Sequence, residues 1–442
     1  MDARLTVFWR TLLVTLAATV ATPALACAAS DPLLPDQWAL ADPGVIGAAE
    51  AWTQTDGAGA LVAILDTGLQ LDHPDLAANL WTNPGEIPGN RIDDDGSGII
   101  DDVHGANMFD FSNDVRDDNG HGTHVAGIVA ARQNNGIGVS GLAPAARILP
   151  VKVLDSGMSG TTDTLAFGIR YAVDRGARIL NVSVNTDVAT DAVTAAVRYA
   201  GERGAIIVAS AGNNGRNIDL RPSYPASLPD PAVFSVAAQS DGEGLLWNLS
   251  NTGLESVDLA APGVRIVATA TNSSYQSRTG TSAAAPFVAA SLALLSSAAP
   301  DLPMSTLRDA ISATTRRSDL LSSLLGGGRL DVGAAMHRAL AGRPWKTSAA
   351  AHSAAALKLS SRSRSRAGSR VALRWTATDA GAVATWRVSL DGRVVARVSG
   401  DRTRFSRRVS RGGRHAWRVV GMNTAGEKVV SARRSFTIIR RR

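Results

Sequence analysis

Residues 60–66 read "ALVAILD", an uninterrupted apolar run that ends in an aspartate. A run of four to eight apolar residues is typical of a strand buried on both faces, as in a parallel sheet. Four more apolar runs follow, separated by segments with helical periodicity. The runs cover 146–154, 178–184, 205–210 and 233–238, and the helical segments about 163–175, 190–203 and 305–315. This alternation predicts an α/β domain with a central, mostly parallel sheet flanked by helices.

The last hundred residues differ from the rest of the 442-residue chain in charge. Residues 343–442 hold 24 Lys and Arg against 4 Asp and Glu, a net charge of +20. The first 342 residues hold 21 against 35, a net charge of −14. Such a contrast indicates two separate units. Residues 343–368 are rich in Ala, Ser and Arg, and we expect them to form a linker between the units.

Residues 369–439 alternate apolar and polar side chains with a period of two, which is typical of strands with one buried face. The apolar positions are Val371, Leu373, Trp375, Trp386, Val388, Leu390, Trp417, Val419, Phe436 and Ile438. They predict a small all-β sandwich, similar to an immunoglobulin or fibronectin III domain, with a basic tail. The alternative is an arginine-rich disordered tail, although four well-spaced tryptophans oppose it.

The N-terminus has the pattern of an export signal. Arg4 and Arg10 precede a short apolar stretch and the small-x-small sequence Ala24-Leu25-Ala26. We expect a signal peptide over residues 1–27, a large domain over 30–342, and a secreted or cell-surface protein. An N-terminal anchor is the alternative, but the apolar stretch is too short to span a bilayer. Cys27, the only cysteine, is either acylated as in bacterial lipoproteins or simply removed, and an intramolecular disulfide is excluded.

Three motifs place a reactive polar residue beside glycine. Asp66 lies in "AILDTGLQLDHPDL", His121 in "DNGHGTHVAGIVAA" and Ser282 in "TGTSAAAPF", where it precedes a long apolar helical segment. Taken alone, each residue has a structural explanation as a helix cap or a packed polar group. Together they supply an orienting carboxylate, a base and a nucleophile.

All three motifs, in this order, resemble those of the subtilisin-like serine proteases over residues 31–340. The resemblance implies an endopeptidase in which Ser282 attacks the peptide bond, His121 transfers the proton and Asp66 orients the imidazole. The motif "ASAGNNG" implies that Asn213 stabilises the oxyanion, together with the backbone N–H of Ser282. The same resemblance assigns peptide binding to Ser183, Val184 and Asn185 on one side and to Ala211 and Gly212 on the other.

Residues 183–186 read Ser-Val-Asn-Thr where the family commonly has Ser-Leu-Gly-Gly. Asn185 in place of glycine adds a side chain beside the first specificity pocket, which favours a narrowed pocket. Three functions remain open: a general endopeptidase, a dedicated processing protease for one partner peptide, and a surface binding protein that uses the protease fold as a scaffold.

The resemblance is greatest to the thermitase-like branch, which implies structural calcium. The matching ligands are Asp31, Asp75, Asn135 and the carbonyls of Ile137 and Val139. A second oxygen-rich loop, "RIDDDGSGIIDD", contains Asp93, Asp95 and Asp101 at a spacing that suits calcium, with a solvated acidic turn as the alternative.

The predicted partners are protein or peptide substrates and, through the basic C-terminal unit, an anionic cell-surface polymer. No nucleic-acid-binding motif is recognisable in the sequence. A monomer is expected.

Overall fold

The computed structural model describes residues 31–241, 245–343, 357–361, 364–377, 385–391, 393–399, 404–410, 413–422 and 428–439. The predicted signal peptide, Cys27 and most of the predicted linker lie outside these residues.

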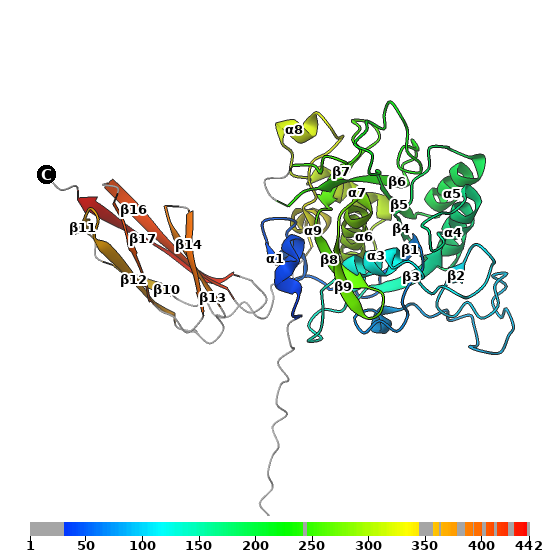
Figure 1. The fold of residues 1–442 in the computed structure, drawn as a ribbon, viewed down its shortest axis with the longest axis horizontal. Coiled ribbons are helices and arrows are strands. Elements are labelled where there is room, and N and C mark those ends of the chain that lie inside the picture. The colour runs from blue at the N-terminus through cyan, green and yellow to red at the C-terminus, as the bar shows by residue number, and fades with distance from the viewer. Residues whose placement is uncertain are drawn as a thin grey trace, which may run out of the picture.

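A seven-stranded parallel sheet forms the centre of the larger unit (Figure 1). Its strand order is β2-β3-β1-β4-β5-β6-β7, and every pairing is parallel. The bounds are β1 Leu61–Asp66, β2 Ala106–Asn107, β3 Arg147–Lys152, β4 Ile179–Val182, β5 Ile206–Ser210, β6 Val233–Gln239 and β7 Leu259–Pro262. The α/β prediction is confirmed. All five predicted strands belong to this sheet, whereas the short β2 and β7 were not predicted.

Helices cover both faces of the sheet, as the apolar pattern of β1 requires. Val62 and Ile64 pack in the cluster that holds α3 (His121–Ala130), α6 (Thr281–Ala298), α7 (Met304–Ala313) and α9 (Val332–Ala339). Ala63 and Leu65 pack in the opposite cluster, with α4 (Thr162–Asp174) and α5 (Asp191–Glu202). Smaller elements are α1 (Trp38–Ala41), α2 (Ala48–Ala51), α8 (Asp319–Ser322), the 3-10 turns Leu34–Asp36 and Ala77–Asn79, and the hairpin β8 (Ile266–Ala270) with β9 (Ser274–Arg278).

Helix α6 is the buried centre of its face. Its first turn holds Ala283, Ala284 and Ala285, all at most 2% exposed, and small side chains let a helix approach a sheet closely. Among the described residues, α6 alone has the length and apolar composition of a membrane span, but most of it is buried inside the protein. We therefore interpret it as a core helix.

The smaller unit consists of two sheets that share one core (Figure 1). The sheets have the orders β10-β12-β15 and β11-β17-β16-β13-β14, and their pairings are antiparallel except for β11 with β17. The bounds are β10 Leu357–Ser361, β11 Arg364–Arg366, β12 Arg370–Ala377, β13 Thr385–Leu390, β14 Arg393–Ser399, β15 Arg404–Arg408, β16 Gly413–Met422 and β17 Lys428–Ile439. Trp375, Trp386 and Trp417 are at most 1% exposed and lie in the shared core.

The predicted C-terminal boundary of the linker, residue 368, is wrong, because strands begin earlier in the chain. Residues 357–361 and 364–366 form β10 and β11, and Leu359 packs against the sandwich core. The Ser and Arg content concealed these strands, because one short strand needs few apolar residues when its partner strands supply the rest of the core.

Candidate active site

The carboxyl end of β1 brings Asp66 against the start of α3. Asp66 is fully buried, and its Oδ1 lies 2.7 Å from Nδ1 of His121, the first residue of α3. Close packing requires glycine at the second helical position, because a Cβ on Gly122 would lie 2.1 Å from the carbonyl oxygen of Gly68. The Gly-rich sequence around His121 therefore fixes the distance between carboxylate and imidazole.

The environment of His121 favours its protonated form. Burial lowers the pKa of His121, but the charge and the hydrogen bond of Asp66 raise it by more, so the pKa lies above the ordinary 6.5. The pair can therefore accept a proton and stabilise the imidazolium that results.

Ser282 is the second residue of α6 and lines the same cavity as His121 and Asn213. The cavity has a volume of about 440 Å³. No hydrogen bond joins the described side chains of His121 and Ser282, as is common before a substrate closes such a site. The carbonyl of Ser282 accepts a 3.3 Å hydrogen bond from Oγ of Ser183, which ties the start of α6 to the end of β4.

Asn213 is held by the residue that precedes Ser282. Its Oδ1 accepts hydrogen bonds from N and Oγ1 of Thr281 at 2.8 and 2.9 Å. A Cβ placed on Gly280 would lie 3.3 Å from both Nδ2 of Asn213 and Oγ of Ser282, so these two atoms face one small space. An amide donor and a hydroxyl therefore converge beside the cavity, an arrangement that suits an attacked carbonyl.

Ser183, Val184 and Asn185, which were predicted to bind the substrate, line the cavity. Asn185 donates from Nδ2 to the carbonyl of Ser210 at 2.7 Å, and its Oδ1 accepts from Oγ of Ser210 at 3.1 Å. Its side chain therefore links the end of β4 to the end of β5. Ala211 and Gly212 are buried and do not line the cavity.

Two supporting side chains were missed by the sequence analysis. Asn251, fully buried, accepts from the backbone N–H of Asn214 and donates to the carbonyl of Ala211, so it shapes the loop that carries Asn213. Asp117 accepts hydrogen bonds from Thr67 and from the first turn of α3. Asp117 lies four residues before His121, and a carboxylate just before a helix start is a recognisable capping signal.

Three of the residues predicted to bind calcium near the N-terminus lie together. Oδ1 and Oδ2 of Asp31 accept from the backbone amides of Asn135 and Asn134, and Nδ2 of Asn135 donates to Oδ1 of Asp75 at 2.6 Å. Val139 donates its N–H to Oδ2 of Asp75, and that of Ile137 binds the side chain of Asn135. Burial, with a contribution from the charge of Asp75, raises the pKa of Asp31.

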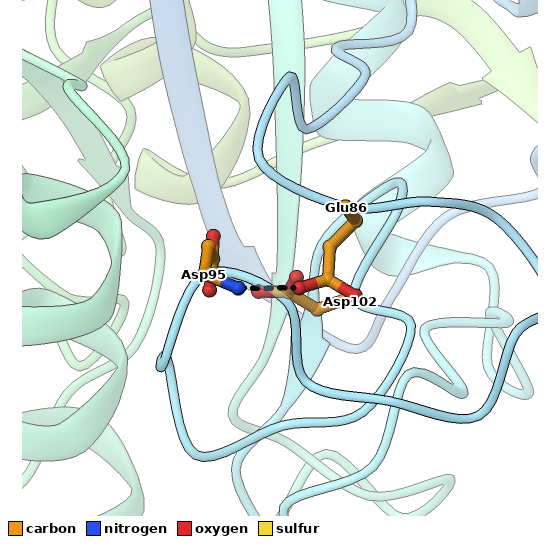
Figure 2. A group of neighbouring side chains, drawn as sticks. All are labelled: Glu86, Asp95 and Asp102. Carbon is orange, nitrogen blue, oxygen red and sulfur yellow. Dashed lines mark hydrogen bonds between the residues drawn. The ribbon is translucent and has the colours of Figure 1, made fainter.

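The second acidic loop groups a different set of carboxylates from the one predicted. Oxygen atoms of Glu86, Asp95 and Asp102 lie within 4.8 Å of one another (Figure 2). The side chains of the other two predicted residues cap backbone amides instead: Asp93 accepts from Ser97 and Gly98, and Asp101 from Gly89 and Arg91. The spacing of acidic residues within the loop could not show that Glu86, which precedes the loop in the sequence, would enter the cluster.

This carboxylate cluster already has protein partners. Arg175 forms an ion pair with Asp95, Asn83 donates to both Asp95 and Asp102, and Tyr171 donates to Asp102 at 2.7 Å. Arg175 offsets the charge of one of the three carboxylates, and Asn83 and Tyr171 supply uncharged donors.

A buried carboxylate, an imidazole, a hydroxyl and an amide donor at the carboxyl edge of a parallel sheet define the class of serine hydrolases that act through an acyl-enzyme. The model of the subtilase family matches residues 57–329, more than half of the chain. The chain belongs to the subtilase family, and it is a subtilisin-like serine endopeptidase.

The relatives agree with the thermitase-like branch. Thermitase from Thermoactinomyces vulgaris is 37% identical over 290 residues, which cover 66% of this chain and 93% of thermitase. The thermophilic serine proteinase of Bacillus sp. (strain AK1) is 38% identical over 248 residues, 56% of this chain and 55% of that protein. A solved protease structure from Pseudoalteromonas arctica PAMC 21717 matches with a TM-score of 0.59 and 28% identity, over 71% of this chain and 99% of that one.

Proposed function

We propose that the chain is an exported, calcium-stabilised endopeptidase that hydrolyses peptide bonds through an acyl-enzyme on Ser282. The 2.7 Å contact between His121 and Asp66, at a cavity that Ser282 also lines, carries this proposal. His121 takes the proton of the Ser282 hydroxyl as it attacks the carbonyl, then returns it to the leaving amine. Asp66 holds the imidazole tautomer and stabilises the imidazolium.

Asn213 is the proposed oxyanion donor. Because Thr281 donates two hydrogen bonds to Oδ1 of Asn213, the Nδ2 group of Asn213 remains directed toward the space beside Ser282. Nδ2 and the backbone N–H of Ser282 would donate to the oxygen that becomes negative in the tetrahedral intermediate. This stabilisation is larger in the transition state than in the ground state, so it raises kcat.

Residues 183–185 are the proposed binding strand for a protein or peptide substrate. An extended peptide adds as a strand to such a segment, with alternate side chains in the cavity. Ala211 and Gly212 would act through their backbone, because the side chain of Ala211 is buried and Gly212 has none. The link from Asn185 to Ser210 supports a narrowed first pocket, and this keeps a dedicated processing protease as the second candidate. A scaffold without activity is disfavoured, because it has no need of the Asp66–His121 contact.

Calcium fits the site near the N-terminus. Asp31 and Asp75 are at most 2% exposed, and the described residues provide them with amide donors but no cationic side chain. Two buried carboxylates with only neutral partners favour a bound cation, and hard oxygen ligands suit calcium. Asp31, Asp75, Asn135 and the carbonyls of Ile137 and Val139 would hold it and attach the N-terminal segment to the domain.

Calcium at Asp93, Asp95 and Asp101 is a weaker part of the proposal. Asp95 has Arg175 and Asn83 as partners, and Asp93 and Asp101 cap backbone amides. A solvated, internally bonded acidic loop explains these contacts without a cation.

Export rests on the signal-like residues 1–27, and surface retention rests on Cys27 or on the basic C-terminal unit. With a net charge of +20, that unit would bind an anionic cell-surface polymer and hold the protease near its substrates.

The proposal is tested by hydrolysis of casein and of a mixed peptide library by the purified chain and by Ser282→Ala, each with and without EDTA. We expect cleavage by the wild type alone and loss of activity with unfolding in EDTA. Cleavage by Ser282→Ala would exclude Ser282 as the nucleophile. If the wild type cleaves only one partner peptide, the processing protease replaces the general endopeptidase.

A further inference from the structure

The outer face of the sheet β10-β12-β15 carries arginines in directly opposed pairs. In β12, Val371 and Leu373 are buried, whereas Arg370 and Arg374 are exposed. The antiparallel register pairs Arg370 with Arg408 and Arg374 with Arg404. Arg404 and Arg408 are also exposed. We call these four residues the arginine face.

Opposed like charges destabilise a sheet unless something neutralises them. Among the described residues, none of the four arginines forms an ion pair with a carboxylate. Asp391, the described acidic residue of this unit, instead binds His415 and the backbone amide of Ala416. The repulsion is therefore not compensated within the described part of the chain, and an external anion would relieve it.

The geometry of the arginine face suits a repeating anion. In an antiparallel sheet the Cβ atoms of two opposed residues are about 5 Å apart, and four residues along a strand separate the two pairs by about 13 Å. Between the pairs lie Ala372 and Ser406, whose small side chains leave a shallow floor. An extended chain lying along the strands would meet one pair and then the next, so the second contact would be intramolecular and would add avidity.

We infer that the arginine face binds a linear, phosphate-bearing polymer of the cell surface. This inference rests on the anionic partner of the proposed function and is independent of the protease chemistry. A phosphate group offers several acceptor oxygens that two guanidinium groups can share, whereas one arginine fork already satisfies both oxygens of a carboxylate. Phosphate therefore uses an opposed pair more fully than a carboxylate polymer does.

The described surface of the sandwich gives no support to single-stranded nucleic acid as the partner. Proteins that bind such strands stack the bases on exposed aromatic rings. The aromatic residues of the described sandwich are buried or half-buried, and Phe405, the one on β15, points into the core. The arginine face therefore provides charge contacts without a stacking platform.

The test measures binding of the full chain to long-chain inorganic polyphosphate, as the phosphate-polymer probe, across a range of salt concentrations. The variant Arg374→Gln/Arg404→Gln removes one opposed pair, and the quadruple variant with Arg370→Gln and Arg408→Gln removes both. The matched control is Arg397→Gln/Arg418→Gln on the outer face of the other sheet. Arg397 opposes Arg387 and Arg418 opposes Arg433, but these pairs lie on different strand pairs and do not follow one another along the same two strands. Hydrolysis of a small peptide is measured for every variant.

We expect about 10-fold weaker polyphosphate binding for the pair variant, about 100-fold for the quadruple variant and little change for the control. Equal weakening by the control would overturn the inference in favour of diffuse attraction, and so would wild-type binding by the quadruple variant. Equal or tighter binding of polygalacturonate would exclude the phosphate chemistry, and tighter binding of DNA would exclude the cell-surface polymer. Peptide hydrolysis should be unchanged in all variants. If the wild type hydrolyses no peptide, that result would contradict the proposed protease function but not the inference about polymer binding.

Discussion

Oγ1 of Thr67, the residue after Asp66, donates a 2.8 Å hydrogen bond to Oδ1 of Asp117, four residues before His121. Oδ2 of Asp117 accepts from N and Oγ1 of Thr123 at 2.8 and 2.6 Å, within the first turn of α3. One half-buried carboxylate therefore joins the end of β1 to the start of α3. Burial raises the pKa of Asp117, but hydrogen bonds from Thr123, Gly120 and Thr67 outweigh this effect, so its pKa lies below 3.8.

The first prediction is that Asp117→Asn lowers kcat by about 10- to 100-fold, because the distance between Asp66 and His121 is no longer fixed. Its charge also raises the pKa of His121, so the variant should move the acid limb of kcat/KM to lower pH. A merely structural role would not move that limb. The control Asp114→Asn breaks an exposed ion pair with Arg116 and should leave both quantities unchanged. An unshifted limb in Asp117→Asn would contradict the effect of its charge on His121, and an unchanged kcat would contradict the positioning role.

The second prediction concerns pH. The free enzyme needs a neutral His121, and the charge of Asp66 raises the pKa of that imidazole above 6.5. Activity should therefore be lost as pH falls through a midpoint above 6.5. The measurement is kcat/KM for a peptide substrate whose own groups do not titrate between pH 5 and 9. A midpoint at or below 6.5 would show that burial outweighs Asp66.

The third prediction is that Asn213→Ala lowers kcat by about 100- to 1,000-fold with little change in KM, because the lost donor acts mainly in the transition state. The magnitude is the one known for the corresponding asparagine of subtilisin and is not a result of this structure. Asn214→Ala is the control, since Asn214 contributes its backbone N–H to Asn251. Equal losses in both variants would point to disruption of the loop.

The fourth prediction is that Asn185→Gly broadens the substrate range. The variant removes the link to Ser210 and gives the segment the glycine that is common in the family. Cleavage after Phe or Leu should rise about 10-fold relative to cleavage after Ala, as for a hydrophobic pocket that admits a larger side chain. A peptide library compares the two enzymes. If the wild type already cleaves best after Phe or Leu, the pocket is not narrowed.

The sequence predicted those features that depend on local pattern. Apolar runs located five strands of the sheet, and glycine-flanked motifs located Asp66, His121 and Ser282, because both signals lie within a few residues. It missed Asn251, which acts on residues 211–216 from far along the chain, and β10, whose core is completed by other strands. It also missed Glu86 in the carboxylate cluster. Each omission depends on a contact between distant segments, which no local spacing records.

The last prediction concerns calcium and stability. A cation bound only by the folded chain stabilises it by RT ln(1 + [L]/Kd), about 4 kcal/mol at a concentration about 1,000 times Kd. EDTA should therefore lower the Tm of the wild type, and added calcium should restore it. Asp75→Asn should have a low Tm that calcium no longer raises, because a buried ligand is lost. The control Asp36→Asn changes an exposed carboxylate five residues after Asp31 and should respond to calcium as the wild type does. A Tm that is independent of calcium in the wild type would contradict the site.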